Sequence, residues 1–161
     1  MKTRIILTLL CLILLSGCNH GIGSFEKGNL DLPALYTKIN EQIGDNVIQM
    51  PLLNDQPWTK KEIEKKYHLD MTIIEDCMVK SSLIDVQTAE IALFKVPKEK
   101  DQELKQAIRY RLDSLESSLG SYHEDVKKQI HNAKQGRIGE YYYLVLGEDG
   151  EKVVNYMKNG A

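Results

Sequence analysis

Residues 88–96 constrain the fold of this 161-residue chain more than any other segment. Their apolar side chains would alternate between the two faces of a strand, with Ala89, Ile91 and Leu93 on one face and Ala92, Phe94 and Val96 on the other. Apolar residues on both faces favour a central strand of a sheet. Pro97 has no backbone N–H to continue the ladder, so we expect the strand to end there.

The remaining periodicity predicts helices before and after this strand. Apolar spacing and cap signals place them at 32–44, from Thr59 (N-cap, with Glu62 in a capping box) to about Tyr67, at 98–119, around residues 126–133, and from Asp149 to Met157. Further strands are expected at 77–83 and in a hairpin within 134–146. This order predicts a single α+β domain over residues 31–161, a small antiparallel sheet of two hairpins with helices packed on one face.

The N-terminus has the pattern of an export signal. Lys2 and Arg4 precede an apolar run at 5–15, which is shorter than the roughly 20 residues that a membrane-spanning helix needs. The run ends in Leu15-Ser16-Gly17-Cys18, which resembles the lipobox of bacterial lipoproteins. We therefore expect residues 1–17 to be a signal peptide, cleaved between Gly17 and Cys18.

Lipidation would follow at the new N-terminus. The Cys18 thiol is the nucleophile that would accept a diacylglyceryl group, and two acyl chains anchor a protein stably at about 0.8 kcal/mol per buried CH₂. Residues 18–30 would form the lipidated cysteine and a flexible tether. The expected location is the outer face of the cell membrane. The alternative is an ordinary secreted protein in which Cys18 is incidental.

Composition excludes several classes of function. Without Lys2 and Arg4, the mature chain has 19 basic and 23 acidic residues, a net charge of −4 that does not suit nucleic-acid binding. Cys11 would leave with the signal and Cys18 would be acylated, so Cys77 has no partner for an internal disulfide. We therefore expect the hydrophobic core to stabilise the domain unaided.

Glu90 is the most informative candidate for a functional side chain. It is the carboxylate in a strand whose alternate positions are otherwise apolar, so it either faces solvent or is buried and paired. It could also be a functional carboxylate, although no second carboxylate at a suitable spacing supports acid–base catalysis. The run Tyr141–Tyr143 would either stack on a sugar or base or, as tyrosines often do in strands, pack in the sheet.

Other candidate residues favour structural interpretations. Acidic Glu75 and Asp76 would raise the pKa of Cys77, which suits a buried structural cysteine better than a nucleophile. The histidines lack metal-ligand spacing and are interpreted as solvated: His20, His68, His123 and His131. The glycines near the C-terminus match no phosphate-binding loop. We expect neither a metal nor a cofactor.

Residues 58–158 resemble a group of uncharacterised bacterial lipoproteins that share the domain of unknown function 4358. The matching features are the strand Ala89-Glu90-Ile91-Ala92-Leu93-Phe94-Lys95-Val96, Arg111-Leu112 in the charged helix that follows it, Tyr122, and the stretch from Asn132-Ala133 through Gly139-Glu140-Tyr141-Tyr142. The family usually follows a lipobox or signal segment. The resemblance implies no catalytic residues.

We therefore expect a membrane-anchored, non-catalytic binding or interaction module, held by diacylglyceryl on Cys18 and acting on a protein partner in the cell envelope. The alternative is a small envelope enzyme that uses Glu90 or a tyrosine near Tyr141.

Overall fold

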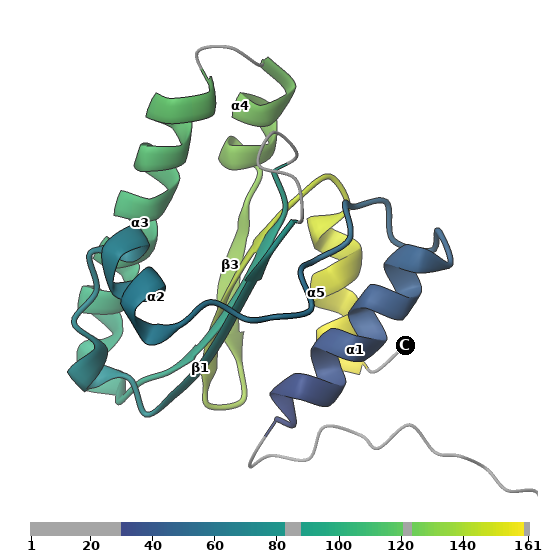
Figure 1. Ribbon diagram of the computed structural model, residues 1–161. Coiled ribbons are helices and arrows are strands. Elements are labelled where there is room, and N and C mark those ends of the chain that lie inside the picture. Colours follow the sequence, from purple (N-terminus) through teal and green to yellow (C-terminus); the bar gives the residue numbers. More distant parts are fainter. Residues whose placement is uncertain (1–29, 83–87, 121–123, 160–161) are drawn as a thin grey trace, which may run out of the picture.

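Four antiparallel strands form a single sheet in the computed structural model, which describes residues 30–82, 88–120 and 124–159 (Figure 1). The strands are β1 (Asp76–Ser81), β2 (Glu90–Lys95), β3 (Lys134–Ile138) and β4 (Tyr141–Leu146). Their spatial order is β1-β2-β4-β3, so the two hairpins β1–β2 and β3–β4 join through an antiparallel β2–β4 pair. The predicted order of helices and strands along the chain is confirmed.

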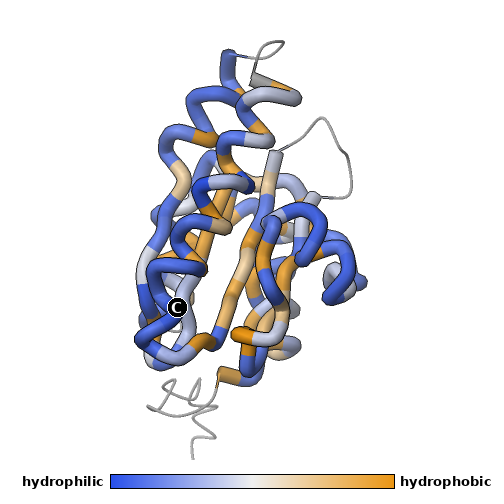
Figure 2. Tube along the Cα trace, turned by 90° about the vertical axis from the view of Figure 1, so that its left-hand side faces the viewer, coloured by the Kyte–Doolittle hydropathy of each residue, from blue (hydrophilic) through white to orange (hydrophobic). Residues whose placement is uncertain are grey.

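The two central strands are buried on both faces. Ile91 and Leu93 of β2 and Tyr143 and Val145 of β4 belong to one hydrophobic cluster. The alternate residues of the same strands belong to a second cluster on the opposite face, which includes Ala92, Phe94, Tyr142 and Leu144. This alternation is the one that the sequence predicts for β2, and Figure 2 shows these hydrophobic strands running between the more hydrophilic outer turns of the helices.

Helices α1 (Leu32–Gly44) and α5 (Gly150–Asn159) cover the first face. Asp31 caps α1 by accepting a hydrogen bond from the backbone N–H of Ala34, and Pro33 occupies its first turn. The fully buried Tyr36 of α1 places its hydroxyl 2.7 Å from the Met78 carbonyl oxygen and 2.8 Å from that of Ile91. The hydroxyl thereby ties α1 to both strands of the first hairpin.

Helices α2 (Lys60–Tyr67) and α3 (Asp101–Leu115) cover the opposite face, and α4 (Glu124–His131) extends this layer at one end (Figure 1). The predicted capping box of α2 is present, since Thr59 Oγ1 accepts from the Glu62 N–H and Glu62 accepts from the Thr59 N–H. After Leu115 the helix continues as a single π-helical turn, Glu116–Gly120. Such turns are rare and occur frequently at functional sites.

The predicted α+β class with two antiparallel hairpins is confirmed, but the expectation that the helices pack on one face is wrong. Helices lie on both faces, α1 and α5 on one and α2 and α3 on the other (Figure 1). The physical reason is the two-sided apolar pattern of β2 and β4, because each exposed apolar face would have to be removed from water by its own layer.

The segment 45–58, between α1 and α2, hydrogen-bonds to the outer edge of β1. The Asn54 N–H donates to the Ser81 carbonyl at 2.8 Å, and the Trp58 N–H donates to the Val79 carbonyl at 2.9 Å. Leu53, which forms a bridge to Ser82, is buried in the first cluster. The segment therefore carries Asn54 and Trp58 to the end of the sheet where β1 finishes and β2 begins.

The predicted signal peptide, Gly17, Cys18, His20 and the tether up to residue 29 lie outside the described residues, as do Tyr122 and His123. Leu30, the last residue of the predicted tether, packs against the first hydrophobic cluster. Among the helices of the described ranges, none is both long enough and apolar enough to cross a membrane.

Candidate functional site

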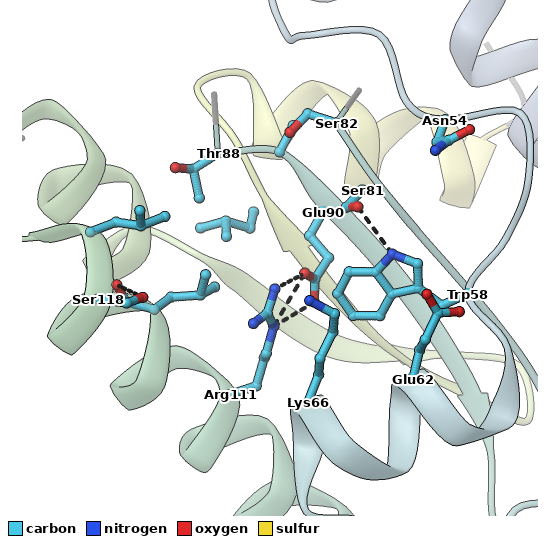
Figure 3. A pocket seen from close by; sticks show the side chains of 14 residues that line it. Asn54, Trp58, Glu62, Lys66, Ser81, Ser82, Thr88, Glu90, Arg111 and Ser118 are labelled. Atoms are coloured by element: carbon cyan, nitrogen blue, oxygen red, sulfur yellow. Dashed lines mark hydrogen bonds and ion pairs between the residues drawn. The ribbon is translucent and has the colours of Figure 1, made fainter. Parts of the chain in front are cut away.

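A pocket of about 440 Å³ lies at the end of the sheet where β2 begins (Figure 3). Segment 54–66 forms one wall, with Asn54, Trp58, Glu62 and Lys66. The other walls are formed by the ends of β1 and β4, residues 88–90, and the C-terminal part of α3 with its π-helical turn, which contribute Ser81, Ser82, Leu146, Thr88, Ala89, Glu90, Arg111, Leu115, Ser118 and Leu119. The pocket is mostly polar.

A buried ion pair between Glu90 and Arg111 lies in this pocket. The Arg111 Nη2 donates to Glu90 Oε2 at 2.6 Å, and its Nε lies 3.2 and 3.3 Å from the two carboxylate oxygens. The Tyr67 hydroxyl donates to Glu90 Oε1 at 2.6 Å. Glu90 is only 1% exposed, so these donors replace the water that an isolated carboxylate would require.

Helical and strand periodicity place the three side chains together. Arg111 follows Leu104 by seven residues and Ile108 by three, which puts it on the inward face of α3. Tyr67 follows Ile63 by four residues on the buried face of α2. Glu90 shares its face of β2 with Ala92 and therefore points toward both helices.

The surroundings fix the protonation of both donors. Burial and the negative charge of Glu90 hold the pKa of the Tyr67 hydroxyl well above its ordinary value, so it remains a donor. For Arg111, burial lowers the pKa, but the adjacent Glu90 outweighs this effect and the net shift is upward. The guanidinium therefore stays charged, and the carboxylate keeps its counter-ion.

Trp58 forms the wall that faces this pair, and two cations lie near its ring (Figure 3). Its Nε1 donates to Ser81 Oγ at 3.1 Å, which fixes the indole against β1. The Lys66 Nζ lies 4.7 Å from the ring centroid and the Arg111 Cζ lies 5.1 Å from it, both within the range of cation–π attraction. The indole thus holds Lys66 at the pocket as well as packing beside the ion pair.

The hydroxyl of Thr88 is buried and has no hydrogen-bond partner in the part of the chain that the structure describes. The residue is 8% exposed, and among the described residues none donates to or accepts from its Oγ1. A buried hydroxyl left unpaired costs about 1–3 kcal/mol of folding free energy. Because Thr88 lines the pocket, a bound molecule could supply the missing partner.

The other sequence candidates lie elsewhere. Tyr141 pairs with Lys95, at the opposite end of the β2–β4 pair from Glu90, so the structure does not bring it near the pocket. All three tyrosines of the run are buried, as the strand interpretation predicts, and the Tyr141 hydroxyl donates to Asp76 Oδ2 at 2.5 Å. A role for this run in stacking on a sugar or base gains no support from this placement.

Cys77 and the described histidines show no catalytic arrangement. Burial, together with Asp76, raises the pKa of the half-buried Cys77 thiol, in line with the sequence interpretation. His68 is exposed and stacks on Tyr110, while His131 lies 3.1 Å from Glu116. Within the described ranges, no three His, Cys, Asp or Glu side chains are grouped closely enough to hold a metal ion.

Sequence reasoning missed Arg111, Tyr67, Trp58, Lys66 and Thr88 as site residues. One signal was available: Arg111 lies at the spacing of the inward-facing residues of its helix, where a cation needs a buried counter-ion. The neighbouring Leu112, by contrast, is only half-buried. The other four residues carry no local signal, since only the fold brings them together.

Comparison with known proteins adds the family. A model described as a domain of unknown function (DUF4358) matches residues 49–147, more than half of the chain. The chain belongs to the DUF4358 family. The matched range contains every residue that lines the pocket, whereas α1 and α5 lie outside it. No curated protein and no solved structure matches this DUF4358 chain.

The first prediction concerns the ion pair of this DUF4358 domain. Glu90→Gln should lower the free energy of unfolding by about 3–5 kcal/mol, because it leaves the buried Arg111 cation without a counter-ion. Urea denaturation measures the change. Glu140→Gln, which breaks an exposed pair with Lys95, is the matched control and should change stability by less than about 1 kcal/mol. Equal effects of the two substitutions would contradict a buried, structural role for the pair.

The second prediction concerns Thr88. Thr88→Val keeps the shape of the side chain and removes the unpaired hydroxyl, so it should raise the free energy of unfolding by about 1 kcal/mol. Thr72→Val is the comparison at an exposed threonine; its hydroxyl hydrogen-bonds to Asp70, so this substitution should lower stability, by no more than about 1 kcal/mol. A loss of stability in Thr88→Val would show that the hydroxyl already has a partner, such as a buried water.

Proposed function

We propose that this protein is a lipid-anchored, non-catalytic binding module of the bacterial cell envelope, and that the pocket at the start of β2 is its binding site. The observation that carries the proposal is a polar pocket that holds, beside a fixed ion pair, a buried hydroxyl with no partner among the described residues. Ligand pockets are commonly pre-formed concave sites in which a few placed polar groups orient the ligand. The volume of about 440 Å³ suits a small molecule.

The geometry of Glu90 favours binding over catalysis. A general acid or base must exchange a proton with a substrate, which requires an accessible oxygen. Both oxygens of Glu90 already accept hydrogen bonds from Tyr67 or Arg111, and the residue is almost fully buried. The alternative of a small envelope enzyme that uses Glu90 or a tyrosine near Tyr141 therefore has less support, and the expected protein partner stays a prediction.

The sequence supports the anchor. The apolar run, the small residues Ser16 and Gly17 and the cysteine directly after them agree in position and in type with a lipoprotein signal. An acidic mature chain gains little from anionic lipid headgroups, so the lipid itself would hold the protein at the membrane.

The third prediction tests this anchor. Cys18→Ala should leave the protein without a diacylglyceryl group, so that it appears as an uncleaved precursor or in the soluble fraction. Membrane fractionation and intact-mass measurement detect the change. Cys77→Ala, at the half-buried cysteine of β1, is the control and should leave membrane partition and lipid mass unchanged. An unaltered mass and partition of Cys18→Ala would refute lipidation at this residue.

The fourth prediction tests the pocket. Ser118 lies at the exposed side of the pocket, whereas the adjacent Ser117 does not line it. The small-molecule fraction of an envelope extract should raise the melting temperature of the wild-type protein and of Ser117→Phe, but not of Ser118→Phe, whose ring would occupy the pocket. Thermal unfolding followed by circular dichroism measures the shift. An absent shift in the wild type, or an equal shift in Ser118→Phe, would contradict the pocket as the binding site.

A further inference from the structure

Four charged side chains line the pocket, and three of them already have partners within the protein. Glu90 and Arg111 neutralise each other at 2.6 Å. Glu62 belongs to the capping box, where its Oε2 accepts from the Thr59 N–H at 2.7 Å and from the Thr59 hydroxyl at 2.8 Å. Lys66 is the one of these four charges that forms no close ion pair or hydrogen bond with another side chain in the described ranges, although its charge acts on Glu62 and helps to lower the pKa of that carboxyl group.

Lys66 forms no close ion pair in the described part of the chain. No Asp or Glu oxygen of the described residues lies within 4.0 Å of its Nζ, although several other lysines, such as Lys95 and Lys100, form such pairs. Its ammonium is instead placed over the Trp58 ring, at 4.7 Å from the centroid. An ammonium fixed on an aromatic face at a pocket wall is already positioned for an anion, so less side-chain entropy is lost on binding.

The uncharged polar groups of the pocket suit hydroxyl groups. Thr88 has an unpaired hydroxyl, Ser81 can donate as well as accept, and the Asn54 amide offers both a donor and an acceptor. The Arg111 guanidinium bonds to Glu90 through Nε and Nη2. Its Nη1 makes no hydrogen bond within the described ranges and is therefore a further donor. A ligand that carried only an anionic group would leave most of these groups unmatched.

Resting on the proposed function, we infer that the pocket binds a small polyhydroxy carboxylate of the sugar-acid class, with its carboxylate at Lys66 and its hydroxyls toward Thr88, Ser81 and Asn54. Leu115, Leu119 and Leu146 supply the apolar side of the pocket, against which the carbon skeleton would pack. The pocket volume admits one sugar ring with space for water. The family carries no assigned ligand, so this chemistry comes from the arrangement of Lys66, Trp58 and Thr88.

The fifth prediction tests this ligand class with two matched probes. Glucuronate and glucose share the ring and its hydroxyls and differ in the carboxylate. Trp58 is the only tryptophan in the chain and lines the pocket, so its fluorescence reports binding directly. The full-length protein in detergent micelles should bind glucuronate at millimolar concentrations and glucose about tenfold more weakly, which corresponds to one charge-assisted hydrogen bond.

Lys66→Gln and Lys65→Gln provide the matched variants. Both remove one positive charge from the exposed surface of α2, but only Lys66 lines the pocket. Lys66→Gln should weaken glucuronate binding about tenfold and leave glucose binding unchanged, whereas Lys65→Gln should leave both unchanged. Circular dichroism of each variant checks that α2 is intact.

Three results would overturn the inference. Equal affinity for glucose and glucuronate would show a pocket that binds hydroxyls without recognising the anion, and the proposed function would stand. Equal competition by inorganic sulfate would show an anion site without hydroxyl recognition. Binding of neither probe would exclude the sugar-acid class, and the shift produced by the envelope extract would then decide separately whether the pocket binds another small molecule.

Discussion

The ion pair between Glu90 and Arg111 is the interaction around which this end of the domain is arranged. Two charges removed from water are stable only with close and complete pairing, so α2, α3 and the first residue of β2 have to meet at a fixed distance. Tyr67 supplies the remaining hydrogen bond, and Trp58 packs its edge against Tyr67. The ion pair inside the pocket and the Trp58 wall are therefore coupled to each other through Tyr67.

The fold was largely predictable because its signals are local. The capping box of α2, the helix from Leu32 to Gly44 and the two-sided apolar pattern of β2 can be read from consecutive residues, and each is present in the structure. The error was the placement of the helices on one face. The pattern of β2 already contained the correction, since a strand that is apolar on both faces needs a layer on each.

The site was less predictable because it depends on long-range packing. Glu90 was recognisable as a carboxylate out of place in an apolar strand, but whether it was paired depended on Arg111, 21 residues away on another element. Thr88, Trp58 and Lys66 are ordinary residues in the sequence. They become informative only in the folded chain, where the Thr88 hydroxyl has no partner among the described residues and the Lys66 ammonium lies over the Trp58 indole.

The segment that brings Trp58 to the pocket has a second effect, on self-association. By bonding to the backbone of Ser81 and Val79, it occupies the edge of β1 that would otherwise be open to a strand of another molecule. The opposite edge, β3, has five residues and carries the charged side chains of Lys134 and Arg137, which pair with Glu151 and Asp101. Neither edge of the sheet described here therefore offers a free, uncharged strand that a second copy of the chain could extend by backbone pairing.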